Sequence, residues 1–357
     1  MADLKLSFAC TPYDRVLPLI TGEVKPDGIT LEYSRAPGGV PRIFYDQMKF
    51  QRYDVSEMSM STYLRMRSIK FPYRMLPVFH NRNFSYTYIH IRKNAGIRQG
   101  HPEDLKGKKI GIGDYQQTLG LWTRGILQAE FGVKPEDMIW YQGRGQHFSH
   151  TGASAEAGLA PPKNVDLRYA TTDFDTMFVN GELDAVTGLG LRRGRAGVGG
   201  YGTGGQVGGS AGLERRGRGG AGEPDLVTLF PDVRQEAIRY FKKTGVYPPN
   251  HCSIVRESII NEHPWVVLSL MEAFEESQRL AIERLQQSPP TLLVFGPHYL
   301  RDLDEVFGTD PFPYGIKANA KAMDMAQTFS VQQGLTERKQ PLDEIFPQEA
   351  FYREEAQ

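Results

Sequence analysis

The feature of this sequence that most limits its fold is a regular alternation of strand-like and helix-like segments. Leu4–Phe8 and Ile29–Tyr33 alternate apolar and polar residues, as half-buried strands do. A helical pattern follows over 43–50, and the order of strand, loop and helix continues beyond it. Strands that alternate with helices favour a largely parallel sheet with helices on both faces. The sequence therefore predicts an α/β protein.

A second series of such segments begins near residue 102. Lys109–Gly113 predicts a short strand, and Thr118–Phe131 predicts a helix whose apolar residues gather near one face. Val165–Ala170 predicts a further strand, and Phe174–Thr187 a unit of helix, turn and strand. The strand pattern of Phe84–Ile91 connects the two series. Two sets of strands and helices indicate two lobes.

The length of the chain supports that division. Its 357 residues are enough for two lobes, each with a core of its own. His251–Val255 predicts a strand that returns to the first lobe, and a long helix begins near residue 263. We therefore expect residues 1–92 to form the first part of lobe 1 and residues 93–249 to form lobe 2. Residues 250–357 then return to lobe 1 and end in helices.

Charge and hydrophobic patterning exclude several kinds of partner. The 42 Lys and Arg residues balance the 42 Asp and Glu residues, whereas a nucleic-acid partner usually requires a basic excess. No apolar run approaches the roughly 18 residues of a membrane span. The start, Met1–Lys5, has no basic region followed by an apolar stretch, so we expect a cytoplasmic protein that binds neither nucleic acid nor membrane. The sequence leaves the oligomeric state open, and a homo-oligomer is compatible with it.

Cysteine and histidine spacing gives little sign of a metal centre. Cys10 and Cys252 are the only cysteines, and we expect two buried, reduced thiols. His147 and His150 have a His-x-x-His spacing, but no nearby carboxylate clearly completes a metal site around them.

One segment does not fit an α/β domain. Residues 191–222 contain 14 glycines and six arginines and almost no large apolar side chain. Such a stretch cannot bury enough surface to offset the entropy of ordering it. RNA binding is disfavoured because the segment interrupts a domain and has no aromatic residue beyond Tyr201. A flexible surface loop and a frame error in the underlying nucleotide sequence remain as its two interpretations.

The loop after the first strand is the first candidate for ligand binding. Open α/β sheets place ligand groups beyond the ends of their strands, and Tyr13, Asp14 and Arg15 follow the first strand. Arg15 can bind a carboxylate through two parallel hydrogen bonds, and Asp14 can hold Arg15 in place. The alternative is that these residues cap the next helix or pair on the surface.

A second candidate is the segment 54–61, which we expect to enter a polar loop at Ser56. Ser59 and Ser61 alternate with methionines, so their hydroxyls can face a cleft while the thioethers fill the core. Glu57 lies beside an apolar stretch, which predicts a raised pKa and a role as an acid. The pattern is equally compatible with serines that only cap the following helix.

The junction Gly113–Thr118 joins a predicted strand to a predicted helix. Free backbone N–H groups at a helix start form an anion site, to which Gln116 and Thr118 add donors. Trp122, one turn into the helix, is a candidate for stacking on an aromatic ring. Many strand–helix junctions share such a pattern, so it is weakly specific by itself.

Two histidines are candidates for proton transfer. His80 begins a polar cluster that includes Arg82, a further candidate for binding carboxylate. His251 lies where the chain is predicted to cross back between the lobes. A histidine that protonates near neutral pH suits proton delivery. Either residue is also compatible with a purely structural role.

Taken together, these segments resemble the 4,5-dihydroxyphthalate decarboxylases. The resemblance covers most of the chain outside about 142–163 and 191–222. The motifs that carry it are Thr11–Arg15, Asp54–Ser59, Gly113–Thr118, Thr244–Pro248 and His263–Trp265. That family looks like an enzyme offshoot of the type 2 periplasmic-binding-protein fold, which implies a ligand cleft between two lobes joined by two crossovers. The Gly/Arg-rich segment departs from the pattern, which puts any site residue from it in doubt.

The resemblance implies decarboxylation of 4,5-dihydroxyphthalate to 3,4-dihydroxybenzoate and carbon dioxide in phthalate degradation. The aromatic ring can itself accept the electrons, so no organic cofactor is required, while a divalent metal chelated by the two hydroxyl oxygens would assist. The implied partner is a small aromatic dicarboxylate. The alternatives are a binding protein of the same fold without catalysis, and a related enzyme of pyrimidine or thiamine precursor synthesis.

Overall fold

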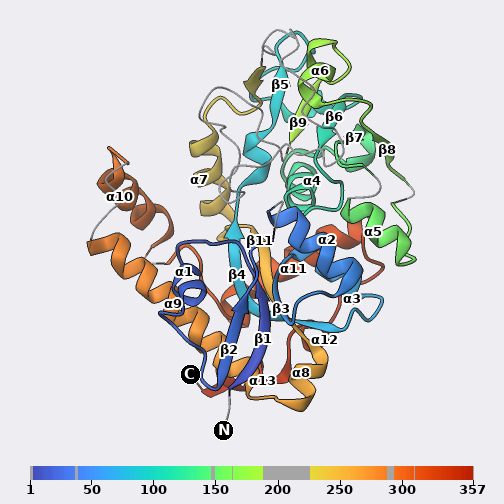
Figure 1. Ribbon diagram of the computed structural model, residues 1–357. Helices are drawn as coiled ribbons and strands as arrows, with labels where there is room; N and C mark the ends of the chain where they lie inside the picture. The colour runs from blue at the N-terminus through green and yellow to red at the C-terminus, as the bar shows by residue number, and fades with distance from the viewer. Residues whose placement is uncertain are drawn as a thin grey trace.

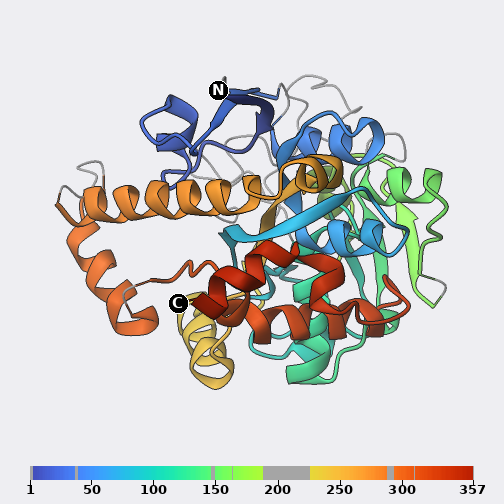
Figure 2. The same ribbon diagram turned by 90° about the horizontal axis from the view of Figure 1, so that it is seen from below.

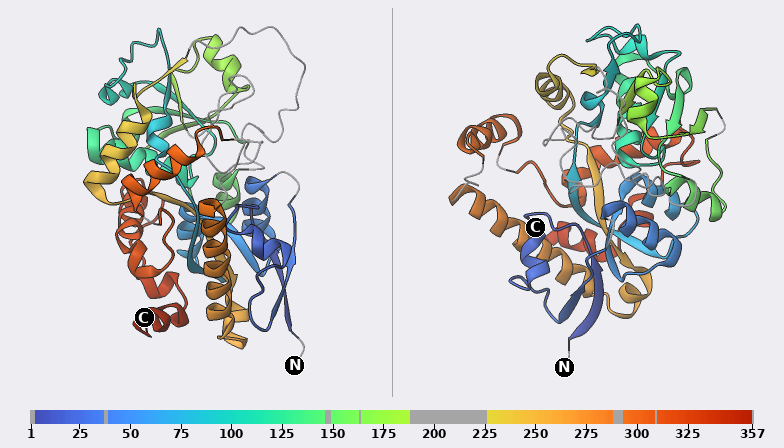
Figure 3. Two further views of the ribbon diagram at one scale, coloured as in Figure 1. Left: turned by 90° about the vertical axis from the view of Figure 1, so that its left-hand side faces the viewer. Right: turned by 45° about the horizontal axis from the view of Figure 1, so that its top comes forward.

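The computed structural model describes residues 3–36, 39–145, 149–162, 164–187, 226–287, 293–308 and 310–356. The segment 191–222, for which a loop was one prediction, lies outside these residues. The described chain forms two β-sheets with helices around them, and Figures 1 and 3 show one sheet above the other. Both termini lie at the end of the molecule that holds the first sheet (Figure 1).

The first sheet combines the N-terminal strands with one strand from far along the chain. In spatial order its strands are β2 (Ile29–Tyr33), β1 (Leu4–Ala9), β3 (Val55–Ser59), β11 (Pro249–Arg256) and β4 (Tyr73–Arg82). β1 is parallel to β2 and to β3, whereas β11 is antiparallel to both of its neighbours, β3 and β4. The strand predicted over His251–Val255 is present as part of β11, which lies in this first sheet.

Strand β3 corrects the sequence prediction of a polar loop from Ser56 onward. All five of its residues are buried, because β1 and β11 flank the strand on both edges. A central strand tolerates polar side chains only where they find hydrogen-bond partners. Glu57 and Ser59 have such partners, as described below, so their polarity marks a site and not a loop.

The second sheet is mixed. In spatial order its strands are β10 (Leu226–Thr228), β5 (His90–Arg92), β9 (Ala185–Thr187), β6 (Lys109–Ile112), β7 (Ile139–Gln142) and β8 (Asp166–Tyr169). β6, β7, β8 and β9 are parallel, whereas β5 is antiparallel to β9 and β10. β5 lies within the range 1–92 assigned from the sequence to the first lobe, yet it pairs in this sheet. The strand predicted over 84–91 is instead a 3-10 turn, η1 (Ser85–Tyr88), followed by β5.

Thirteen helices surround the sheets in the part of the chain that the structure describes. They are α1 (Leu17–Thr21), α2 (Val40–Phe50), α3 (Met60–Arg67), α4 (Thr118–Phe131), α5 (His150–Glu156), α6 (Phe174–Val179), α7 (Val233–Thr244), α8 (Glu257–Glu262), α9 (Val266–Gln287), α10 (Gly296–Phe307), α11 (Ile316–Gln332), α12 (Leu342–Ile345) and α13 (Gln348–Ala356). Helix α4 has the predicted bounds and ends at Gly132, whose positive φ of 65° suits a residue without a Cβ. Within the described residues, no helix is long and apolar enough to cross a membrane.

The C-terminal helices pack against both lobes. Helix α9 runs as a long rod beside the first sheet (Figure 2) and contacts α1, β4 and α13. Helix α11 packs instead against α4 of the second lobe, where the Phe329 ring meets the Trp122 ring edge to face at 5.7 Å. The chain after β11 therefore adds a third connection between the lobes.

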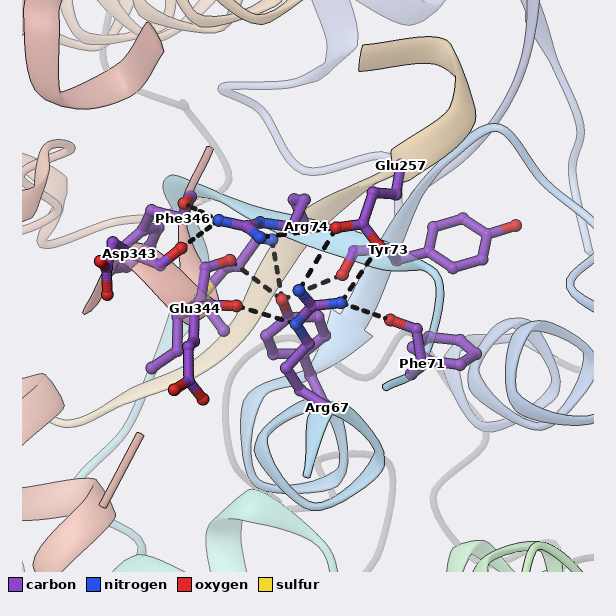
Figure 4. A network of polar contacts seen from close by, with 11 residues as sticks. Arg67, Phe71, Tyr73, Arg74, Glu257, Asp343, Glu344 and Phe346 are labelled. Atoms are coloured by element: carbon purple, nitrogen blue, oxygen red, sulfur yellow. Dashed lines mark hydrogen bonds and ion pairs between the residues drawn. The ribbon is translucent and has the colours of Figure 1, made fainter. Parts of the chain in front are cut away.

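A network of ion pairs and hydrogen bonds fixes helix α12 to the first lobe (Figure 4). Arg67 of α3 donates to both oxygens of Glu257, at 3.2 and 3.3 Å, and to the backbone oxygen of Glu344 at 2.8 Å. Arg74 of β4 pairs with the same Glu257 and donates to the backbone oxygens of Asp343 and Phe346. Two guanidinium groups thus join α3, β4, α8 and α12.

The contact between α4 and α11 gives a prediction about stability. A Cβ at Gly125 would lie 2.1 Å from Cδ2 of the Phe329 ring, and a packed aromatic ring cannot retreat cheaply. We expect Gly125→Ala to lower the free energy of unfolding by about 1–3 kcal/mol, although alanine favours a helix more than glycine does. Urea unfolding measures the change. The control is Gly145→Ala, whose Cβ would meet nothing within 4 Å; equal losses in both variants would contradict the prediction.

Candidate active site

Glu57 lies at the centre of the candidate site. Its side chain is completely buried in β3, and three groups from two segments, the loop after β1 and strand β11, are within hydrogen-bond distance of its carboxylate. The backbone N–H of Thr11 donates to Oε2 at 2.8 Å, and the Tyr13 hydroxyl donates to Oε1 at 2.7 Å. Nδ1 of His251 lies 2.6 Å from the same Oε1. A carboxylate with these partners is held in one orientation.

Strand pairing explains why these residues meet. Ser253 pairs with Glu57, and His251 pairs with Ser59, across the antiparallel β3–β11 ladder. Directly paired residues and their neighbours two positions away share one face of a sheet, so all four side chains point the same way. The loop that holds Tyr13 follows β1, the other neighbour of β3.

The environment of Glu57 overturns the prediction of a raised pKa. Burial does raise the pKa of Glu57, but the hydrogen bond and charge of His251, the charge of His80 and the Thr11 N–H outweigh it and lower the pKa to about 2. Glu57 is therefore an ionised carboxylate at neutral pH. It cannot donate a proton, and its Oε1 fixes the orientation of the His251 ring through Nδ1.

His251 presents its other nitrogen away from this carboxylate. The ring meets the Phe44 ring edge to face, with centroids 4.9 Å apart, and the residue is 8% exposed. With Nδ1 directed at Glu57, Nε2 is left without a hydrogen bond to any described residue. His251 is thus an oriented imidazole with one nitrogen available to a ligand.

His80 has a different environment from His251. It is completely buried, Nε2 lies 2.7 Å from Oγ of Ser253, and its ring stacks on Tyr13 at 6.0 Å between centroids. Burial is the main reason that the pKa of His80 is lowered to about 3. His80 is neutral at physiological pH, which does not suit the proton delivery considered from the sequence. Its contacts support Tyr13 and Ser253.

Arg15 lies close to this group. Its guanidinium carbon is 4.8 Å from the Tyr13 ring centroid and 4.2 Å from that of Phe312, so it is held between two aromatic faces. Nη1 donates to the exposed carboxylate of Asp14 at 3.0 Å, while the buried Nε has no partner. Arg15 is positioned to bind an anion beside the Glu57–His251 pair, and Asp14 holds it.

The second lobe contributes a polar cluster around the completely buried Asp114. Its carboxylate accepts from the backbone N–H groups of Gln116 at 3.1 Å and His150 at 2.6 Å, and from the Thr151 hydroxyl at 2.9 Å. Nη1 of Arg144 lies 4.0 Å from Asp114 and has no hydrogen-bond partner. Oε1 of Gln116 is also unpartnered, while its Nε2 donates to Ser154 at 2.7 Å.

Three hydrogen bonds connect the lobes beside this cluster. Oγ of Ser59 lies 2.9 Å from Oγ1 of Thr118, which also accepts from the backbone N–H of Ser61 at 3.0 Å. Oγ1 of Thr62 lies 3.2 Å from Nδ1 of His150. The hydroxyls of Ser59 and Thr118, both predicted to bind ligand, hydrogen-bond to each other. Oγ of Ser61 is buried and has no hydrogen-bond partner.

Arg82 and Trp122 contact the segment by which the chain returns to the first sheet. Arg82 is buried and donates to the backbone oxygen of Tyr247 at 2.9 Å and to Asn319 at 2.5 Å. Trp122 is buried, and Nε1 donates to the backbone oxygen of Pro249 at 2.7 Å. Both side chains fix the segments that cross between the lobes, because Tyr247 and Pro249 begin the return to the first sheet. Arg82 also lines a cavity with Tyr247 and Asn319, and its buried Nε has no hydrogen-bond partner, so its predicted role in binding carboxylate stays a prediction.

The structure adds residues that no sequence motif marked as ligand-binding. Phe44, Phe312 and Tyr314 approach the site from α2 and from the segment before α11. Tyr314 has a buried hydroxyl without a partner, and Arg15 and Cys10 act electrostatically on it. Their only signal is aromatic character, which core residues share. Among the described residues, no three His, Cys, Asp or Glu side chains are grouped to hold a metal ion, and the His147 of the His-x-x-His pair lies outside them.

Comparison with known proteins identifies the family. A 4,5-dihydroxyphthalate decarboxylase of Comamonas testosteroni is 30% identical over 351 residues, which cover 97% of this chain and 97% of that protein. The chain belongs to the 4,5-dihydroxyphthalate decarboxylase family. A member of this decarboxylase family from Pseudomonas putida is 36% identical over 191 residues, 53% of this chain and 71% of that protein.

The fold of this decarboxylase family member is that of periplasmic binding proteins, as predicted. Residues 41–158 match a family model described as the periplasmic substrate-binding protein of a phosphonate ABC transporter. The structure aligns with a periplasmic sulfonate-binding protein of Methylobacillus flagellatus at a TM-score of 0.54, with 14% identity over 99% of this chain and 94% of that one.

The buried histidines predict how stability depends on pH. The folded-state pKa of His80, about 3, lies below its ordinary 6.5, and that of His150 is lowered by burial to about 4. The unfolded chain therefore binds more protons below pH 6.5. Stability is complete above that pH and falls by about 1.4 kcal/mol per pH unit for each histidine as the pH drops toward 4.

Urea unfolding between pH 7.5 and pH 4.5 tests this slope. His80→Gln, which can keep a hydrogen bond to Ser253, should reduce the slope by about 1.4 kcal/mol per pH unit. Ser253→Ala serves as the control, because it removes the hydrogen bond but keeps the buried histidine. An unchanged slope in His80→Gln would show that His80 does not titrate on unfolding.

Proposed function

We propose that this protein is a non-oxidative aromatic acid decarboxylase that converts 4,5-dihydroxyphthalate to 3,4-dihydroxybenzoate and carbon dioxide. The observation that carries the proposal is the buried, ionised Glu57, which holds His251 beside Arg15. Membership of a family whose named relatives are 4,5-dihydroxyphthalate decarboxylases supports the choice of substrate.

The chemistry of this substrate matches what the site offers. Each carboxylate is para to a hydroxyl group, so ionisation of that hydroxyl pushes electron density onto the carbon that bears the carboxylate. A proton added to this carbon takes up the electron pair. The bond to the carboxylate carbon then breaks, carbon dioxide leaves, and the bonding pair returns to the ring. One proton enters the product for each carbon dioxide released, and no redox step takes place.

Three residues of the first lobe have roles in these reaction steps. His251 delivers the proton through Nε2, while Glu57 stabilises the charged ring through Nδ1–H. Arg15 binds the carboxylate that the product retains, because a guanidinium forms two charge-assisted hydrogen bonds to a carboxylate. The arrangement resembles other acid–base pairs in which a carboxylate fixes the tautomer of a histidine.

The first experiment mixes the purified protein with 4,5-dihydroxyphthalate in D₂O, without added cofactor, and follows carbon dioxide and product. We expect 3,4-dihydroxybenzoate with one deuterium on the carbon ortho to the remaining carboxylate, because that carbon receives the proton. A parallel reaction with a chelator tests whether a divalent metal on the hydroxyl oxygens assists. Tight binding without product would contradict the proposal and favour a binding protein for aromatic carboxylates.

Variants of the acid pair test the assigned roles. We expect His251→Gln and Glu57→Gln to lower kcat by about 10²–10⁴-fold, the range typical for a lost acid–base group. The controls are His263→Gln and Glu262→Gln, the same changes at a partly exposed and an exposed position at the end of α8. Circular dichroism checks that each variant is folded. Full turnover in His251→Gln would remove His251 from the mechanism.

A further inference from the structure

His150 of the second lobe faces the same region as His251 of the first. It begins helix α5, and its Nδ1 lies 3.2 Å from Oγ1 of Thr62 in α3. Its ring meets the Phe44 ring edge to face, with centroids 5.6 Å apart. Phe44 contacts the His251 ring in the same manner at 4.9 Å. The two imidazoles therefore border one aromatic ring, and His251 acts electrostatically on His150.

The free nitrogen of His150 needs an explanation. The residue is 2% exposed, and Nε2 is buried without any hydrogen-bond partner. Unpartnered buried polar atoms are rare in proteins and cost free energy, so they often mark a site for a ligand. When Nδ1–H donates to Thr62, Nε2 carries a lone pair and is an acceptor.

The charges around His150 favour its neutral form. Burial is the main cause of its lowered pKa, which is about 4. Asp114 acts in the opposite direction, while Arg144 and His251 also lower the pKa. The neutral imidazole keeps its lone pair at physiological pH, so Nε2 is free to accept a proton from a ligand, and the negative charge of a bound dicarboxylate raises the pKa that burial has lowered.

We propose that Nε2 of His150 is the general base that removes the proton from the substrate hydroxyl para to the departing carboxylate. This inference rests on the proposed function. It assigns ionisation of the substrate hydroxyl to the second lobe. The hydroxyl and the carbon that loses carbon dioxide lie at opposite ends of one ring. A base and an acid that approach a single aromatic ligand from two lobes meet that requirement.

The proton balance of this step is complete. The hydroxyl O–H bond breaks and an Nε2–H bond forms on His150, while the oxygen's electron pair enters the ring. The carbon para to it takes a proton from Nε2 of His251, and its bond to the carboxylate then breaks. His150 returns its proton to the oxygen, and solvent restores the proton on His251. Arg144, whose buried Nη1 makes no hydrogen bond, can donate to the ionised oxygen.

The experiment separates this inference from the proposed function by a binding measurement. Product 3,4-dihydroxybenzoate is titrated into the protein at pH 7, and the ultraviolet difference spectrum reports whether its hydroxyl is ionised. We expect a bound phenolate in the wild-type protein and a neutral phenol in His150→Gln. His263→Gln, the matched control, should keep the phenolate spectrum. An identical spectrum in wild type and His150→Gln would overturn the assignment of His150.

Kinetics give a second readout that a structural role would not move. We expect His150→Gln to lower kcat about 10²–10⁴-fold with little change in KM, and a higher pH should restore part of the rate because the hydroxyl then ionises unaided. Added imidazole should partly restore His150→Ala. Should α5 fail to fold in these variants, Thr62→Val keeps the ring and removes only the partner of Nδ1.

The outcomes remain distinguishable. A wild-type protein without turnover would overturn the proposed function, while the spectrum would still decide whether His150 ionises a bound phenol. Turnover that is unchanged in His150→Gln and Thr62→Val would keep the proposed function and exclude His150 as the base.

Discussion

The structure depends on the burial of one ionised carboxylate, that of Glu57, in the middle of the first sheet. An uncompensated buried charge costs several kcal/mol, so the hydrogen bonds from Thr11, Tyr13 and His251 must all form together. Those donors come from β11 and from the loop after β1, the two neighbours of β3. A slip of one residue in either pairing would turn Glu57 to the other face and leave it unpaired. The carboxylate therefore specifies strand register as well as histidine orientation.

The same fold serves binding proteins, so the difference proposed here lies in a few side chains and not in the architecture. A binding protein needs only groups that hold an anion, such as Arg15 between its two aromatic rings. Decarboxylation also needs an acid and a base at opposite ends of the ligand ring. In the proposed mechanism the acid belongs to the first lobe and the base to the second, so chemistry requires both lobes to contact the ligand. The hydrogen bonds of Ser59 with Thr118 and of Thr62 with His150 hold the lobes in that relation.

Local periodicity was sufficient for much of the fold and insufficient for the site. Helix α4 has its predicted bounds because its apolar face and its terminal glycine are both local signals. Strand β3 was missed because its polar residues imitate a loop, and only the partners supplied by β11 explain them. The predicted direction of the Glu57 pKa was wrong for the same reason, since His251 is 194 positions away. The contacts of Arg82 and Trp122 with the backbone carbonyls of Tyr247 and Pro249 could not be predicted either, because these partners are also far away in the sequence.

The position of β11 has a consequence for how the protein is made. This strand lies between β3 and β4, which are adjacent in the sequence but do not pair with each other. While the chain is being synthesised, the edges of β3 and β4 stay open until Pro249–Arg256 leave the ribosome. The second lobe has local strands and helices of its own and is complete by then, whereas the first lobe must wait for a long loop to close. The nascent first lobe thus exposes two unpaired strand edges for most of translation, and such edges favour aggregation with other chains.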